Sequence, residues 1–77
     1  MSDYLNKIKK IVSEKTGIDS SEISEESFIG DDLNIGEMDL IEMLEEMEDI
    51  FQVNLVEKAD SFETIQDIID ALEEKIQ

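Results

Sequence analysis

Cysteine, histidine and arginine are all absent from this chain. Without cysteine the protein can form no disulfide and offers no thiol of its own, and the lack of histidine removes most transition-metal sites. No apolar run approaches the length of about 20 residues that spans a membrane, and no signal-peptide pattern stands at the N-terminus. We therefore expect a cytoplasmic protein with no metal site.

Positive charge is scarce as well. Six lysines face 22 acidic residues, which gives a net charge of −16 at pH 7. Such an excess of negative charge disfavours nucleic acid and membranes as partners, and it favours basic protein surfaces. The imbalance is uneven along the chain, because no base lies between Lys15 and Lys58.

The 77 residues are expected to form a single domain, residues 1–77, with a small hydrophobic core. Apolar residues recur at helical spacing in two terminal segments, about 3–15 and 64–76. In the first segment they are Tyr4, Leu5, Ile8, Ile11 and Val12. In the last segment they are Ile65, Ile68, Ile69, Leu72 and Ile76. Gly17 suits the position just after a helix, and Thr64 with Asp67 has the spacing of a capping box.

The segments between the helices are predicted to be mostly irregular. Residues 17–36 form a long loop, whose candidate anchors to the core are Ile18, Ile23, Phe28 and Ile29. Four apolar residues after residue 51 could be buried: Val53, Leu55, Val56 and Phe62. A lone strand there would have no partner, so a short helix over about 56–60 is predicted. The fold class is therefore all-α, a small bundle of three main helices and one short helix.

The stretch from Asp31 to Phe51 has the strongest pattern and predicts a helix over 37–51. At about 100° per residue, its apolar residues fall within about 120° of a helical wheel. These are Leu40, Met43, Leu44, Met47, Ile50 and Phe51. Asn34 and Glu37 have the spacing of a capping box, and a carboxylate at Glu37 suits the positive end of the helix dipole. Met38 lies outside the stripe, on the acidic side.

The rest of this helix carries seven acidic residues without a base among them. They are Glu37, Asp39, Glu42, Glu45, Glu46, Glu48 and Asp49. Like charges three or four positions apart destabilise a helix by roughly 0.2–0.5 kcal/mol a pair. A solvated surface is the ordinary interpretation of such charges, but uncompensated repulsion favours a docking surface. We predict docking of a partner through Met38, Asp39, Glu42, Glu45, Glu46, Glu48 and Asp49.

This arrangement resembles helix II of the acyl carrier proteins. In that family an Asp-Ser-Leu triplet, preceded by Leu, begins the helix, and an acid-rich face and a Phe follow. Leu33 matches the preceding Leu, and Gly36-Glu37-Met38 stands at the triplet. The later residues in register are Asp39, Glu42, Glu48, Asp49 and Phe51. The resemblance covers the whole chain and implies the family's long first loop, together with enzyme partners that present lysine and arginine. Glu45 and Glu46 depart from the apolar residues common in the family.

The resemblance also implies what Glu37 replaces. The family's serine carries 4′-phosphopantetheine through a phosphodiester, and the thiol of that arm carries the acyl group. A carboxylate cannot accept the group in that transfer, so no prosthetic group is expected at Glu37. Attachment to Ser24 or Ser27 would place the group in the loop, away from the start of the helix.

Two other interpretations of these residues are less well supported by the sequence. Glu37 has no base, nucleophile or metal cluster beside it, so we expect no enzyme. Asp31, Asp32, Asn34 and Gly36 hint at a calcium loop, but the spacing fails. Counted from Asp32, the glycine comes one place early and the twelfth position holds Met43 instead of Glu.

The sequence therefore predicts a monomeric acyl-carrier-like domain without phosphopantetheine. It would dock its acidic helix onto basic enzymes of fatty-acid, lipid or polyketide metabolism. The alternative is a functional acyl carrier protein of fatty acid biosynthesis. That reading requires another attachment residue, or an engineered or divergent chain in which Glu37 has replaced the serine.

Overall fold

The computed structural model describes residues 4–76, and the side chains of residues 4–75. Its elements are α1 (Tyr4–Thr16), η1 (Ser20–Glu22), α2 (Glu37–Phe51), η2 (Val56–Ser61) and α3 (Ile65–Ile76). Three main helices and a short 3₁₀ helix near residue 56 confirm the all-α prediction, and η1 adds one turn within the long loop. The expected helix start at residue 3 and the side chain of Ile76 lie outside the described part.

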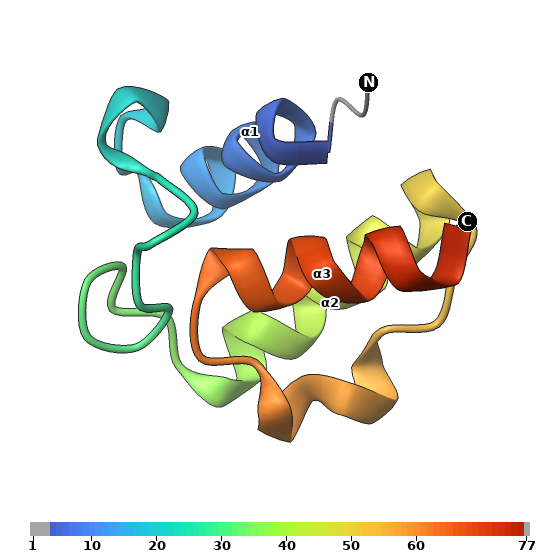
Figure 1. Ribbon diagram of the computed structural model, residues 1–77. Helices are drawn as coiled ribbons and strands as arrows, with labels where there is room; N and C mark the ends of the chain where they lie inside the picture. The colour runs from blue at the N-terminus through green and yellow to red at the C-terminus, as the bar shows by residue number, and fades with distance from the viewer. Residues whose placement is uncertain (1–3, 77) are drawn as a thin grey trace.

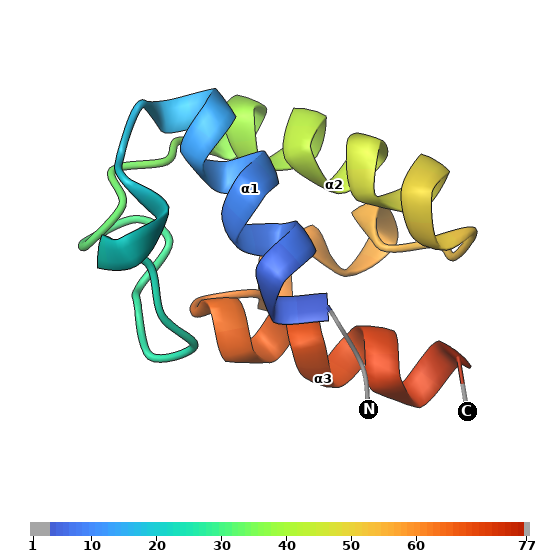
Figure 2. The same ribbon diagram turned by 90° about the horizontal axis from the view of Figure 1, so that it is seen from above.

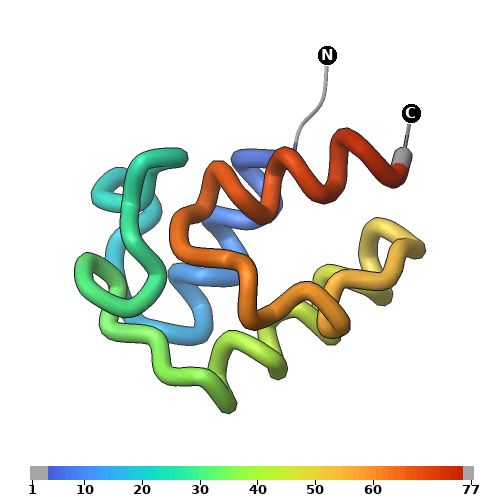
Figure 3. Tube along the Cα trace, turned by 60° about the horizontal axis from the view of Figure 1, so that its bottom comes forward, coloured from blue at the N-terminus to red at the C-terminus, as the bar shows by residue number. Residues whose placement is uncertain are grey.

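The helices pack around α2 from two sides. Seen from above, α2 and α3 run in roughly the same direction, and α1 crosses over the space between them (Figure 2). η2 lies on the side opposite α1 and leads from the end of α2 back to the start of α3 (Figures 1 and 3). The long first loop closes one end of the bundle. One side of α2 is therefore left facing away from the other helices.

Most residues predicted to be apolar anchors are buried. From the helices they are Ile8, Ile11, Val12, Leu40, Met43, Leu44, Met47, Ile65, Ile68, Ile69 and Leu72. From the loops they are Ile23, Ile29, Leu55 and Phe62. Leu33 and Ile35 are buried as well, although they were not among the predicted anchors. Tyr4, Leu5, Ile18, Phe51, Val53 and Val56 are partly buried and pack against this core. Each fully buried Leu, Ile or Met contributes about 1.5–3 kcal/mol of transfer free energy, so packing dominates the stability of the fold.

Two predicted core residues are instead half-exposed. Phe28 and Ile50 each keep 47% of their surface accessible. Phe28 forms an isolated antiparallel bridge with Thr64, and on such extended backbone the neighbouring Ile29 points inward while Phe28 points out. Ile50 lies at the edge of the α2 stripe and borders an open recess toward Lys7 on α1. The prediction that these two side chains are buried was wrong.

The capping box predicted at Asn34 and Glu37 was also wrong. The residue that caps α2 is Gly36, and no side chain bonds to the cap. Asn34 adopts a left-handed backbone with φ of 55°, a conformation that asparagine tolerates. This bend lies between Leu33 and Ile35, which are both buried, so the loop turns there to place the two side chains in the core.

The capping signals predicted at the start of α3 and at the end of α1 are confirmed. Thr64 Oγ1 accepts a hydrogen bond from Asp67 N at 3.3 Å, and Asp67 Oδ2 accepts from Thr64 N at 3.1 Å. Gly17 follows α1 with φ of 82°, and its N–H donates to Ser13 O at 2.8 Å. These contacts satisfy backbone groups that a helix end leaves unpaired.

The first loop is tied to the start of α3 by three backbone hydrogen bonds. Ile29 N donates to Glu63 O at 2.8 Å, and Ile65 N donates to Ser27 O at 3.2 Å. Gln66 N donates to Glu25 O at 2.9 Å. Two N–H groups of the first turn of α3 thus find partners in a segment about 40 residues earlier in the chain.

In the described part of the chain, no helix has both the length and the apolar character to cross a membrane.

Gly17→Ala is expected to lower the free energy of unfolding by about 1 kcal/mol, because alanine is strained at a positive φ. Urea denaturation of the purified variants measures the change. Gly30→Ala is the matched control, since Gly30 lies outside the left-handed region and a Cβ there meets open space. An equal loss in both variants would show that the conformation of Gly17 is not the cause.

Candidate functional site

The start of α2 presents one carboxylate at the surface. Glu37 is the first residue of the helix, and Leu40 N donates to Gly36 O at 2.9 Å to close the first turn. The Glu37 side chain is exposed and makes no hydrogen bond or ion pair with any described residue. Its charge lies at the positive end of the helix dipole, as the sequence predicts. The residue at the start of α2 is therefore accessible to a partner.

The predicted docking residues mostly share one exposed side of α2. The exposed acids beyond Glu37 are Asp39, Glu42, Glu45, Glu46 and Asp49. Met38 lies beside them with 77% of its surface accessible, so its predicted place outside the core is confirmed. We call Met38 and these five acids the α2 face. Nothing in the structure tests whether a partner binds there.

A lysine of α1 lies against the α2 face. Lys15 Nζ donates to Glu42 Oε1 at 2.5 Å, across 27 positions of sequence. This hydrogen bond raises the pKa of the Lys15 ammonium, partial burial opposes the rise, and the charge of Glu42 adds to it. The charges of Asp39 and Glu46 raise it further. The expectation that no base compensates these acids was therefore wrong, since sequence spacing within the helix could not reveal a base from α1.

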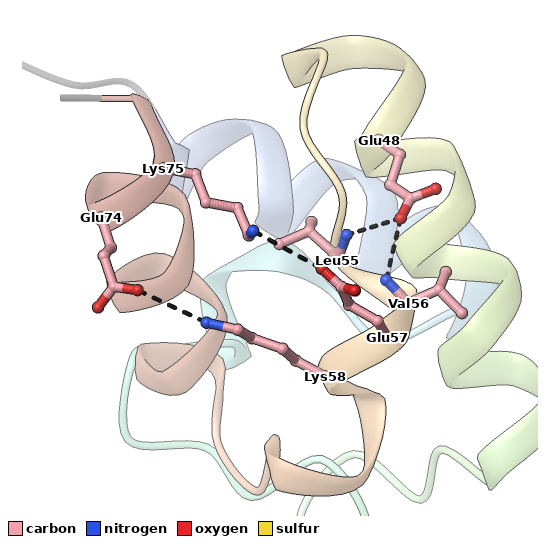
Figure 4. Close-up of polar contacts among 7 residues, drawn as sticks. All are labelled: Glu48, Leu55, Val56, Glu57, Lys58, Glu74 and Lys75. Atoms are coloured by element: carbon pink, nitrogen blue, oxygen red, sulfur yellow. Dashed lines mark hydrogen bonds and ion pairs between the residues drawn. The ribbon is translucent and has the colours of Figure 1, made fainter.

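Glu48 is positioned differently from the other acids of α2. Its Oε2 accepts hydrogen bonds from Leu55 N at 2.6 Å and Val56 N at 2.9 Å, which secures the start of η2 (Figure 4). These two bonds lower the pKa of the Glu48 carboxyl. The side chain is partly buried between α2 and η2. Glu48 stays a predicted docking residue, but the structure gives it a bonding role that its sequence neighbours lack.

The turn after α2 explains how Glu48 reaches these backbone groups. Gln52 has a left-handed backbone with φ of 60°, and its N–H donates to Glu48 O at 2.8 Å. The chain reverses there and returns along the helix, so residues seven and eight positions later meet the Glu48 side chain. No periodic pattern predicts such a contact, because it depends on the turn.

The lysines near the C-terminal end pair with acids of the adjoining element. Lys58 Nζ lies 3.5 Å from Glu74 Oε1, and Lys75 Nζ lies 3.8 Å from Glu57 Oε2 (Figure 4). Both pairs join η2 to α3. Exposed pairs of this kind contribute about 0–1 kcal/mol each. In the described part of the chain, Lys15 is the base that pairs with the α2 face.

The loop serines and acids take part in local structure. Ser27 keeps only 8% of its surface accessible, and its Oγ accepts a hydrogen bond from Ser24 N at 3.0 Å. Asp32 Oδ2 accepts from Phe28 N at 2.8 Å, within a turn of the loop. Among the described residues, no three histidine, cysteine, aspartate or glutamate side chains are grouped to hold a metal ion.

The chain is similar in sequence to proteins of known family. No family model matches the chain. It is 36% identical over 76 residues to an acyl carrier protein of Thermotoga maritima, across 96% of this chain and 93% of that protein. It is 30% identical over 76 residues to an acyl carrier protein of Thermosynechococcus vestitus, across 97% and 94% of the two chains.

Glu48→Gln is expected to lower the free energy of unfolding by about 1 kcal/mol at pH 7, because a neutral amide accepts the two hydrogen bonds less strongly. Since folding lowers the pKa of Glu48, its stabilising effect is complete above the ordinary value of 4.5. That effect is lost as the pH falls below 4.5 through the lowered value in the folded protein. Urea denaturation across the pH range should therefore show the stabilities of the two proteins converging as the pH falls below 4.5.

Glu45→Gln is the control for this prediction. It removes the same charge from an exposed residue of α2 that bonds to no described group. We expect it to leave stability unchanged or slightly raised, because it relieves repulsion between neighbouring acids. A loss equal to that of Glu48→Gln would contradict the capping role of Glu48.

Proposed function

The chain belongs to the acyl carrier protein family, and we propose that it serves as a docking protein of that family without a phosphopantetheine group. In this proposal it is a monomeric, cytoplasmic binding protein and not an enzyme. Its partners are basic enzymes of fatty-acid, lipid or polyketide metabolism. The observation that carries the proposal is the exposed carboxylate of Glu37 at the first residue of α2.

The chemistry of Glu37 supports the absence of the prosthetic group. Attachment in this family joins a hydroxyl oxygen to phosphate as a phosphodiester. A carboxylate oxygen would give a mixed anhydride instead, which water cleaves readily, so the residue does not fit the group. Ser27 and Ser24 are poor substitutes, because Ser27 is buried and the Ser24 hydroxyl lies 3.4 Å from the Ser27 hydroxyl within the loop.

The electrostatics of α2 support the docking role. Five exposed acids lie on one side of a helix, and the chain as a whole carries a charge of −16. Such a field attracts a basic protein surface over a distance of about 10 Å at 0.1 M salt and speeds association. Met38 adds an apolar contact among these charges, which gives a partner a point of specific recognition.

The second candidate function is a working acyl carrier. Similarity over nearly the whole length to two proteins named as acyl carrier proteins favours it. It requires another attachment residue in this chain, or a natural or engineered replacement of the serine in an otherwise ordinary carrier. The version with another attachment residue differs from the docking protein in that a transferase can modify the wild-type chain.

Glu45→Lys is expected to weaken binding to a phosphopantetheinyl transferase by roughly three- to tenfold at low salt, mainly through slower association. Stopped-flow fluorescence with a labelled transferase measures the association rate, and circular dichroism checks the helical content. Glu26→Lys makes the same change in net charge within the exposed first loop. Equal weakening by both variants would mean that total charge, and not the α2 face, governs binding.

Glu37→Ser is expected to make the protein modifiable, because it restores a hydroxyl at the exposed start of α2. Wild type should gain no phosphopantetheine mass when incubated with the transferase and coenzyme A. Gly36→Asp combined with Glu37→Ser should be the better substrate, since the family has Asp before its serine. Intact-mass spectrometry measures the product.

Modification of the wild type at any serine would overturn the proposal in favour of the working carrier. A folded double variant that stays unmodified would show that the docking surface no longer suits this transferase.

A further inference from the structure

The α2 face has two parts. We call Asp39, Glu42 and Glu46 the paired edge, and Met38, Glu45 and Asp49 the open strip. Lys15 approaches from α1 and bonds to Glu42, while Asp39 and Glu46 lie near enough for their charges to act on the same ammonium. These three acids therefore already face a cation of their own chain. The carboxylates of Glu45 and Asp49 make no hydrogen bond or ion pair with a described residue. The α2 face thus offers a partner two different electrostatic environments.

The open strip has a defined layout. Glu45 and Asp49 are four positions apart, so their side chains lie on neighbouring turns about 5–6 Å apart. Met38 precedes Glu45 by seven residues, which is about 10 Å along the helix. On the wheel, Met38, Glu45 and Asp49 fall within about 40° of one another. An apolar contact and two carboxylates therefore follow one line along the exposed side of α2.

The paired edge is already occupied by a cation. Lys15 keeps 31% of its side chain accessible and Glu42 keeps 55%, so the pair lies at the surface, where another cation can reach it. A basic side chain of a partner that approaches Glu42 meets the Lys15 ammonium, which repels it. Binding to Glu42 must then break an existing hydrogen bond, whereas binding to Glu45 or Asp49 breaks none that the structure describes.

We propose that Lys15 is an intramolecular competitor for Glu42, so that a partner first binds the open strip of Met38, Glu45 and Asp49. The inference builds on the proposed docking function and specifies the kind of partner. That partner presents an apolar pocket for Met38, with one basic side chain about 10 Å further along for Glu45 and a second about 16 Å along for Asp49. It gains Glu42 as a third contact only by displacing Lys15.

Lys15→Gln tests the proposal, with the phosphopantetheinyl transferase as the probe. The variant is expected to bind about two- to fivefold more tightly at low salt, which is the effect of freeing one exposed carboxylate. Lys9→Gln is the matched control, because it changes the net charge equally and Lys9 pairs with no described acid. Calorimetric titration measures the affinities. Adding Glu42→Gln should cancel the gain of Lys15→Gln.

The reactivity of the lysines gives a second readout that needs no partner. An ammonium held by Glu42 is acylated more slowly than a solvated one, so limited acetylation should modify Lys15 more slowly than Lys9. Saturating transferase should raise the rate at Lys15 if the partner displaces it. Peptide mass spectrometry measures both rates.

The outcomes separate this inference from the proposed function. Equal affinity gains for Lys15→Gln and Lys9→Gln, or equal acetylation of the two lysines in the free protein, would overturn the competitor role and leave docking intact. Failure of the transferase to bind any variant would overturn docking to this enzyme, while the acetylation rates of the free protein would still decide whether Glu42 holds Lys15.

Discussion

The apolar stripe of α2 is held between α1 on one side of the molecule and η2 on the other, and the distribution of charge follows from this packing. Leu40, Met43, Leu44 and Met47 are buried, so the helix has only its remaining side on which to carry acids. In a chain of net charge −16, that side becomes crowded with carboxylates. Neighbouring elements contact the acids at its two edges. Lys15 of α1 pairs with Glu42, and two backbone N–H groups at the start of η2 and just before it donate to Glu48.

Helical periodicity was enough to predict the elements and most of the core, because apolar spacing of three and four residues determines which side of a helix is buried. The prediction from periodicity failed where the backbone outside the helices determines whether a side chain is buried or exposed. Phe28 turns outward because its backbone pairs with Thr64, and Asn34 bends the chain to bury the residues on either side. The contact between Lys15 and Glu42 joins two helices across 27 positions, which no local pattern can reveal.

The family relationship and the local chemistry of this chain bear on different questions. Similarity to acyl carrier proteins over nearly the whole length accounts for the helical bundle and the long first loop. It says nothing about the residue at the start of α2, where the sequence has Glu37 and the structure leaves that side chain exposed. The functional proposal therefore depends on one side chain, while the fold depends on the whole sequence.

The hydrogen bonds between the first loop and the start of α3 have a consequence for the order of folding. A ribosome releases the N-terminal part of a chain first, yet Glu25, Ser27 and Ile29 find their backbone partners only at residues 63–66. The loop that leads into α2 therefore cannot complete its bonding until residues 63–66 are available to it. α1 and α2 both precede residues 63–66, so the packing of these two helices against each other does not require that later segment. This connection spans about 40 residues and α1 also packs against α3, so the fold depends on contacts that are distant in sequence, which form more slowly than local ones.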